Sequence, residues 1–167
     1  MIKNTAISRA IVSIDLADYY PAEADNMYID LKDYLFKGLI LKEADFRTAM
    51  DTMDWEQFRN KQVGLFCSTD AIVPMWAYMV IATSLAGIAK MVLFGKKEDF
   101  PLVFLHEAIR NIDVSEYQDK RLVIKGCGDK TIDEQAFTLV SFKLAAIAKA
   151  ISYGEPCSTV PVHKRVD

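Results

Sequence analysis

The segment DWEQFRNKQVGLFCSTDAIVPMWAYMVIATSLAGIAKMVLFG, Asp54–Gly95, recurs without a gap 59 residues later as DVSEYQDKRLVIKGCGDKTIDEQAFTLVSFKLAAIAKAISYG, Asp113–Gly154. Ten of the 42 aligned positions are identical, including Ile88-Ala89-Lys90 against Ile147-Ala148-Lys149. An ungapped match of this length indicates an internal duplication, although two copies do not make a solenoid. These two repeats decide the fold.

Each repeat has the pattern of a strand, a helix and a second strand. A short apolar run leads through a turn into a helical segment, and a second apolar run closes on glycine. Such a βαβ unit has parallel strands and a right-handed crossover. We expect strands near 62–66, 90–94, 121–125 and 149–153. Between the repeats, Asp99–Asn111 carries apolar residues at helical spacing and predicts a return helix.

The alternation of strands and helices predicts the fold class. We expect an α/β three-layer sandwich with a mainly parallel sheet of core order 2-1-3-4, built from two duplicated βαβ units. Residues 1–53 would add an N-terminal α+β extension. There, alternation over Ala10–Leu16 predicts an edge strand, and Glu43–Met53 a short helix. Because no linker separates the parts, we expect a single domain over 1–167, with repeats at 54–95 and 113–154.

Composition and charge narrow the class of protein. The net charge is −3 and no run of basic residues is interleaved with aromatics, so neither nucleic acid nor anionic lipid is an expected partner. Three cysteines cannot form a complete set of intrachain disulfides. With no apolar leader after Met1, the expectation is a cytoplasmic protein with reduced thiols.

One segment has nearly the length of a membrane span. Ala71–Ala89 is nineteen residues without a charge. Its counterpart in the second repeat, Thr131–Lys149, carries charged residues and opens with Thr131-x-x-Glu134, the signature of a capping box. The homologous position is therefore that of a soluble helix, and we expect the first helix to be covered. A second copy of the chain could cover it, which predicts a homodimer.

The three cysteines occupy similar places in the pattern. Cys67, Cys127 and Cys157 each follow an apolar run. If these runs are parallel strands of one sheet, the thiols emerge at one edge, and the first and third strands flank the crevice where α/β proteins bind ligands. The pattern predicts a metal site shared by three thiolates.

Three thiolates suit an open zinc site or an iron–sulfur cluster with one exchangeable iron. Asp70, Asp129 and His163 are candidates for a fourth ligand. Ser68, Thr69 and Gly128 would line the same loops, and Asp70 and Asp129 are equivalent in the two repeats. No nucleotide cofactor is expected, because the chain lacks a dinucleotide fingerprint and a phosphate loop.

Other functions fit the same residues. Free cysteine is often a small buried hydrophobe, and no Cys-x-x-Cys spacing supports a metal. The chain could then be a non-catalytic interaction protein with the apolar helix as its surface, or an enzyme using a reactive thiol or persulfide. Ser68, Thr69 and Asp70 also suit a helix N-cap. His106, in mid-helix, is expected to be structural and far from the strand ends.

Four segments of the chain are distinctive: Gly38–Arg47, Cys67–Tyr78, Lys125–Lys130 and Gly154–Pro161. In these segments the chain resembles an uncharacterised bacterial family, domain of unknown function 2480, over nearly its whole length. The resemblance implies no established activity. It suggests iron–sulfur assembly proteins as partners, which favours cluster or sulfur handling over structural zinc.

Overall fold

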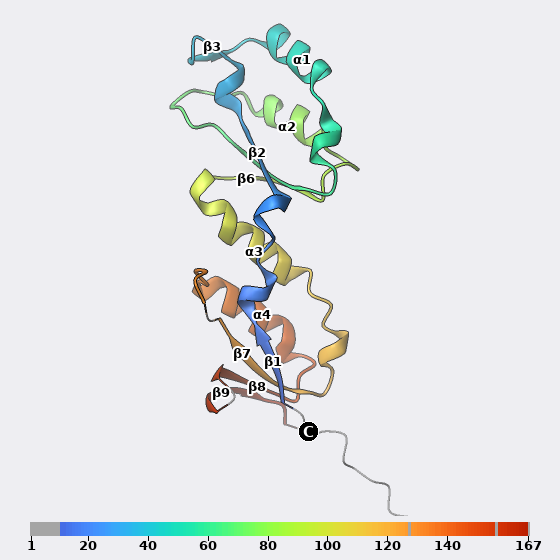
Figure 1. Ribbon diagram of the computed structural model, residues 1–167, viewed down its shortest axis with the longest axis vertical. Helices are drawn as coiled ribbons and strands as arrows, with labels where there is room; N and C mark the ends of the chain where they lie inside the picture. Colours follow the sequence, from blue (N-terminus) through green and yellow to red (C-terminus); the bar gives the residue numbers. More distant parts are fainter. Residues whose placement is uncertain (1–10, 127, 156, 167) are drawn as a thin grey trace, which may run out of the picture. The chain divides into compact units, whose positions relative to one another are not determined.

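A computed structural model of the chain describes residues 11–126, 128–155 and 157–166 (Figure 1). It is a mixed α/β fold with mostly parallel strands. The chain groups into two compact units, one of residues 21–100 and the other of residues up to Tyr20 together with Pro101 onward. We call them the inserted unit and the outer unit. Folding as a single domain stays a prediction, because compactness does not measure whether the units unfold together.

The inserted unit contains a parallel sheet of order β2-β5-β6. Its strands are β2 (Asn26–Asp30), β5 (Gln62–Phe66) and β6 (Met91–Phe94), and helix α2 (Met75–Ser84) connects the last two. A two-stranded hairpin, β3 (Leu35–Phe36) and β4 (Ile40–Leu41), precedes helix α1 (Glu43–Thr52). Strand β5 is buried along its whole length, since it has a strand on either side.

A single hydrophobic cluster fills the inserted unit. It joins the sheet, the two helices and the short helical turns, and its buried members are Ile29, Leu31, Leu41, Phe46, Met50, Phe58, Val63, Leu65, Val73, Ala77, Ile81 and Leu85. Phe100 lies against β5, so closely that the ring occupies the place of a side chain at Gly64. The core therefore fixes α1 and α2 against the sheet.

The outer unit contains a sheet of order β1-β7-β8-β9. Strands β1 (Ile11–Asp15), β7 (Arg121–Lys125) and β8 (Ala150–Glu155) are parallel, and β9 (Ser158–Lys164) returns antiparallel to β8. Helix α4 (Glu134–Ala145) connects β7 to β8, and helix α3 (Phe100–Arg110) precedes them in the chain. The hydrophobic cluster of this unit draws on all of these elements except β9.

The two units have the same strand pairing. In the inserted unit Asp30 pairs with Phe66, and in the outer unit Asp15 pairs with Lys125. The left-handed backbone also recurs, with φ of 60° at Asn60 and 58° at Asp119. Each of these residues donates its N–H to an isoleucine carbonyl at 2.9 Å. The correspondence follows the spacing of 59 residues seen in the sequence.

A second sequence match lies in the N-terminal region and was not predicted. Ile14–Tyr19 reads IDLADY and Ile29–Tyr34 reads IDLKDY, fifteen residues apart. Each copy ends the edge strand of one unit and continues as a short 3₁₀ helix, Leu16–Tyr19 or Leu31–Tyr34. Both leucines are fully buried, so the motif anchors an edge strand to each core.

The predicted positions of the elements are confirmed, and the predicted sheet order is wrong. Strands occur at all four expected places, with β1 as the predicted edge strand, and α1 and α3 lie where helices were expected. However, β5 and β7, predicted to be neighbours in order 2-1-3-4, belong to different sheets. Each already has strands on both sides, because β2 pairs with β5 and β1 with β7. The three-layer arrangement stays a prediction.

The predicted helix starts also need correction. Helix α4 begins at Glu134 and its N-cap is Asp133, whose carboxylate accepts the N–H of Ala136 at 3.1 Å, so Thr131 does not cap it. Helix α2 begins at Met75 after Pro74, with no side-chain cap among its described residues. Ser68, Thr69 and Asp70 are therefore not helix caps. Proline suits this boundary because its fixed φ favours the start of a helix.

Candidate functional site

The carboxyl edge of the β2-β5-β6 sheet brings together a carboxylate and a thiol. Asp30 is the last residue of β2, and Cys67 and Ser68 follow β5 directly. The Asp30 Oδ1 atom accepts the N–H of Ser68 at 3.0 Å and that of Lys32 at 3.0 Å. The loop after β5 is one of the two loops predicted to line a site at the end of parallel strands, whereas the other was predicted to follow β7, which belongs to a different sheet.

The Asp30 carboxylate is held in its ionised form. Its side chain is largely buried, and the Lys32 Nζ atom lies 3.4 Å from Oδ2. Burial by itself would raise the pKa of Asp30, but the hydrogen bonds from Ser68 and Lys32 outweigh burial and lower the pKa below its ordinary value. The carboxylate thus ties β2 to the loop after β5.

Cys67 is a partly buried free thiol that packs against the core of the inserted unit. Its Sγ atom lies 3.4 Å from Thr69 Oγ1. Burial raises the pKa of the Tyr78 phenol. The nearby Cys67 and Asp30 side chains raise it further. The partner found for the thiol is a hydroxyl rather than an imidazole, so no base to activate it is identified among the described residues.

The equivalent edge of the outer unit is closed by ion pairs. The Lys125 Nζ atom lies 3.3 Å from Asp15 Oδ2 and 3.6 Å from Glu155 Oε1. Asp15 also accepts the N–H of Ala17 at 3.0 Å, as Asp30 does for Lys32. Asp15 and Asp30 were both missed from the sequence, although the repeated IDLxDY motif marks them. Their shared role is to tie an edge strand to the helical turn that follows.

The other predicted site residues are spread over both units. Thr69 and Asp70 are exposed in the inserted unit, whereas Gly128, Asp129 and Cys157 are exposed in the outer unit. Cys127 lies outside the described residues. Within residues 11–126, 128–155 and 157–166, no three His, Cys, Asp or Glu side chains are placed to hold a metal ion. The site with ligands Cys67, Cys127 and Cys157 stays a prediction.

The structure places the two histidines in different elements, His106 in helix α3 and His163 in strand β9. His163 was predicted in a tail, but it lies in β9 opposite Ile151, and its Nε2 atom is buried without a hydrogen-bond partner in the described part of the chain. The His106 Nε2 atom lies 2.8 Å from an oxygen of Asp133, the N-cap of α4. His106 thus lies within a helix as predicted, and its contact with this N-cap is a structural one.

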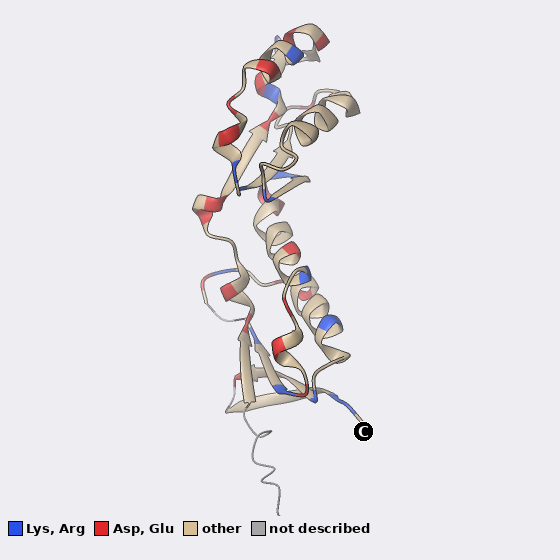
Figure 2. Cartoon of the chain, turned by 90° about the vertical axis from the view of Figure 1, so that its right-hand side faces the viewer, with Lys and Arg blue, Asp and Glu red and all other residues tan. Residues whose placement is uncertain are grey.

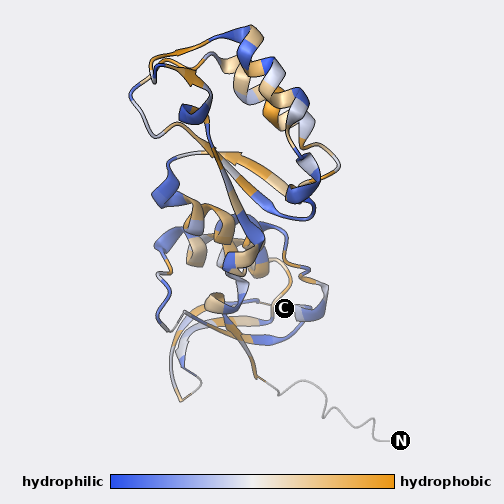
Figure 3. Cartoon of the chain, turned by 45° about the horizontal axis from the view of Figure 1, so that its top comes forward, coloured by the Kyte–Doolittle hydropathy of each residue, from blue (hydrophilic) through white to orange (hydrophobic). Residues whose placement is uncertain are grey.

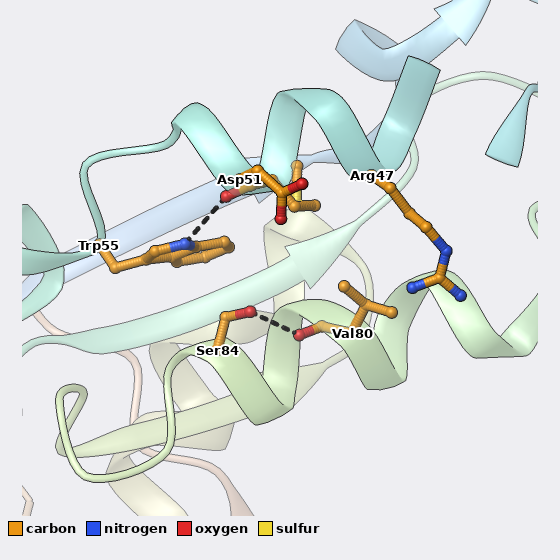
Figure 4. Close-up of a pocket in the computed structure, with 6 residues that line it drawn as sticks. Arg47, Asp51, Trp55, Val80 and Ser84 are labelled. Atoms are coloured by element: carbon orange, nitrogen blue, oxygen red, sulfur yellow. Dashed lines mark hydrogen bonds between the residues drawn. The ribbon is translucent and has the colours of Figure 1, made fainter. Parts of the chain in front are cut away.

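A cleft of about 540 Å³ separates α1 from α2 in the inserted unit (Figure 4). Its donors are already engaged. The Trp55 indole donates to the Met50 carbonyl at 3.1 Å, and the Ser84 hydroxyl donates to the Val80 carbonyl at 3.0 Å. The Arg47 guanidinium pairs with Glu43 at 2.8 Å. The Asp51 carboxylate also lines the cleft, so the group it offers a ligand is an acid beside donors that are engaged elsewhere.

The most conspicuous surface of the inserted unit is apolar and exposed. The exposed fraction is 92% for Ile72, 77% for Met75 and 65% for Met79. Ile72 forms a bridge with Ile40 of the β3–β4 hairpin, where Leu39 is exposed as well. We call these five residues the α2 surface. No charged side chain occurs on α2, and the hairpin beside it is strongly hydrophobic (Figures 2 and 3).

The α2 surface belongs to a helix that is too short to cross a bilayer. The helix has ten residues, and no helix in the described part of the chain is long and apolar enough to be a membrane span. The uncharged segment Ala71–Ala89, which has nearly the length of a membrane span, is divided between a loop, a short helix and a turn.

Replacing Asp30 by alanine is expected to lower the free energy of unfolding by about 1–2 kcal/mol at neutral pH, because two backbone N–H groups lose their acceptor. The folded pKa of Asp30 is lowered, so its contribution is present above the ordinary value of about 4 and lost as the pH falls through the folded pKa. Denaturant titrations at several pH values measure this. The difference between variant and wild type should shrink below about pH 4.

The matched control is Asp33→Ala in the same helical turn. Asp33 is exposed, and its substitution should change the free energy of unfolding by less than about 0.5 kcal/mol. A difference for Asp30→Ala that persisted unchanged at pH 3 would contradict an ionised acceptor.

Comparison with known proteins identifies the family and no closer relative. The model of the family described as "Protein of unknown function (DUF2480)" matches residues 1–165, so the chain belongs to this family. The search of curated proteins and the search of solved structures each found no match.

Proposed function

We propose that this member of the DUF2480 family is a non-catalytic interaction protein that forms a homodimer through the α2 surface. The observation that carries the proposal is the exposure of two large apolar side chains on one short helix, Met75 and Met79, and of Ile72 just before it, beside an equally exposed hairpin. Contiguous apolar surface on a water-exposed protein marks interaction sites, because its burial is the main source of association free energy.

A comparison with the outer unit supports the view that these apolar side chains serve a function rather than the fold. At the spacing of 59 residues, Ile72, Met75 and Met79 correspond to Thr131, Glu134 and Thr138. The outer unit therefore has polar residues at all three positions, on α4 and in the loop just before it. Because the fold does not require apolar residues there, a partner for the α2 surface is the simplest reason for them.

A second copy of the chain is the occupant that suits the surface best. The α2 surface has no charge, so two copies brought together by a two-fold axis meet without like-charge repulsion. Methionines are common at such interfaces since their flexible side chains adapt to one another. An isologous contact of this kind buries the same residues twice.

Sedimentation equilibrium of the full chain over a range of concentrations tests the proposal. We expect a reversible monomer–dimer equilibrium that persists in high salt, since hydrophobic contacts are not screened. A monomer at all concentrations, or a dimer that dissociates when salt is added, would contradict an apolar interface.

We also propose that the two units are copies of one ancestral unit, each with an IDLxDY edge strand followed by a βαβ repeat. The identical register of the strands and the two left-handed residues support this. So does an aromatic pair in each unit. Tyr78 and Phe94 pack edge to face with ring centroids 5.0 Å apart, and the equivalent Phe137 and Tyr153 do so at 5.4 Å.

Metal or iron–sulfur binding through Cys67, Cys127 and Cys157 is a second proposal, with Asp70, Asp129 or His163 completing the shell. It is favoured by the two described cysteines, which are free thiols. The thiols would have to come from the ends of two sheets, or from two protomers. Iron–sulfur assembly proteins would then be partners.

Metal analysis of anaerobically purified protein tests the second proposal. A bound metal should be near stoichiometric and lost in Cys67→Ser, Cys127→Ser and Cys157→Ser variants, since each removes a ligand. Metal-free wild type that still dimerises would exclude this proposal and leave the first intact. Fast alkylation of one cysteine at neutral pH would instead favour a thiol enzyme.

A further inference from the structure

A hollow of about 300 Å³ lies on the outer unit, over strands β7, β8 and β9. Three cations line it: Arg121 at the start of β7, Lys149 just before β8, and Lys164 at the end of β9. The hydroxyl residues Ser152 and Thr159 line it as well. No carboxylate is among the described residues that form the hollow.

The register of the strands explains why the cations converge. Arg121 pairs with Ala150, and Ala150 pairs with Lys164, so the three residues form one row across the sheet and face the same side. Adjacent strands are about 4.8 Å apart, which puts the two cationic residues about 10 Å apart at the backbone. The short Ala150 side chain between them leaves the space open.

The row faces away from the hydrophobic core of the unit. Ile124 and Ile151, which alternate with Val123, Ala150 and Ser152 of the lining along β7 and β8, belong to the core cluster. On the same face of the sheet as the row of cations, Ile11 and Val123 provide an apolar wall beside them. The hollow thus combines positive charge, hydroxyl donors and a hydrophobic side.

The charge of the hollow is not neutralised by the ion pairs found in the unit. Asp119 lies near Lys149, as the lowered pKa of its carboxyl reflects, but the first cause of that shift is Arg165, 2.6 Å away. Among the described residues, the ion pairs of this unit involve neither Arg121 nor Lys164. The preceding residues 1–10 contain basic residues and no acidic one.

From this juxtaposition we infer that the hollow binds a small phosphorylated molecule with an apolar part. The phosphate would lie between the Arg121 guanidinium and the Lys164 ammonium over Ala150, and the hydroxyl residues would donate to its oxygens. The apolar part would contact Ile11 and Val123. A volume of about 300 Å³ suits a small ligand rather than a polymer. The inference is independent of the dimer proposed above.

Phenyl phosphate is a suitable probe, because it carries a phosphate monoester on an apolar ring. Titration of the isotope-labelled full chain, followed by amide chemical shifts, should give saturable shifts at Arg121, Ala150, Ser152 and Lys164 at millimolar concentrations. Inorganic phosphate should bind more weakly, since it has no apolar part. Equal binding of the two would contradict a role for the apolar wall.

Two substitutions test the clamp. Arg121→Gln installs the residue that the inserted unit has at the equivalent position, Gln62. This variant and Lys164→Gln should each weaken phenyl phosphate binding about tenfold or more, because each removes a charge-assisted contact. Lys90→Gln is the control, since Lys90 is the exposed counterpart of Lys149 in the other unit. It removes the same charge and should leave the affinity unchanged.

Three results would overturn the inference: no saturable shift in the hollow, the same loss of affinity in Lys90→Gln as in Arg121→Gln, or tighter binding of a short oligonucleotide than of phenyl phosphate. The last would assign the cations to a nucleic acid. The substituted residues are exposed on the sheet, so unchanged amide spectra away from the hollow should confirm that the variants fold.

Discussion

The variant Ile72→Thr, Met75→Glu, Met79→Thr is expected to be a monomer at concentrations at which the proposed wild-type dimer forms. Each of the apolar side chains should contribute about 1.5–3 kcal/mol when it is fully buried, and a two-fold interface loses all of them from both protomers. The dissociation constant should rise by at least about 100-fold. Sedimentation equilibrium measures the change directly.

This variant should still fold, because the outer unit has the same three polar residues at the equivalent positions, one just before α4 and two on it. Glutamate at the first position of a helix is also favoured by the helix dipole. The matched control is Phe142→Thr, which removes another highly exposed apolar side chain, from α4. It installs the residue found at the equivalent position 83. If both variants dimerised like the wild type, the α2 surface would not be the interface.

The substitution Gly64→Ala is expected to lower the free energy of unfolding by about 1–3 kcal/mol. A Cβ atom at this position would lie 2.7 Å from the nearest ring atom of Phe100. The ring is fully buried and has Tyr28 and Phe66 as aromatic neighbours at 5.6 and 6.2 Å, so it has little room to move. Denaturant unfolding of the variant measures the cost of this overpacking.

Gly95→Ala is the control, because its Cβ atom would approach the same ring at an ordinary contact distance of 3.5 Å. The change in the free energy of unfolding should stay within about 0.5 kcal/mol. Equal effects of the two substitutions would show that Phe100 does not fit against β5 as described.

The internal repeat was sufficient to predict where the strands and helices lie. The short apolar runs before and after each helix have the length and β-branched content of buried strands, and the glycine at the end of each repeat closes the pattern. The same spacing carried over into the structure, where the register of β5 with β6 equals that of β7 with β8. The strands and helices form where the local sequence pattern predicts them, because each unit packs its own hydrophobic core.

The sheet order could not be predicted in the same way, since it depends on pairing between distant segments. The repeats contain only two strands each, and their free edges are taken by β1 and β2 from the N-terminal region. The IDLxDY motif carries this information, but only a comparison of 14–19 with 29–34 shows it. If these edge strands are left out, the pattern of the repeats predicts that β5 and β7 pair and that the loops after them, with their cysteines, are neighbours.

The candidate site was predicted only in part. Ser68 lies at the expected edge of a parallel sheet, but its backbone N–H binds Asp30, a residue 38 positions earlier. Strand β9 was missed because Ser158–Lys164 alternates weakly and contains Pro161, which normally argues against a strand. As an edge strand it tolerates proline, and it supplies both His163 and the Lys164 of the proposed phosphate site.

The most direct test of the central claim is a mixed-label NMR experiment on the wild-type dimer. One half of the protein carries ¹³C-labelled methionine methyl groups and the other half is unlabelled, so that filtered NOEs report only contacts between protomers. The account predicts intermolecular NOEs at the Met75 and Met79 methyl groups, because both lie on the exposed α2 surface. A dimer in which these methyl groups show no contact with the partner would contradict it.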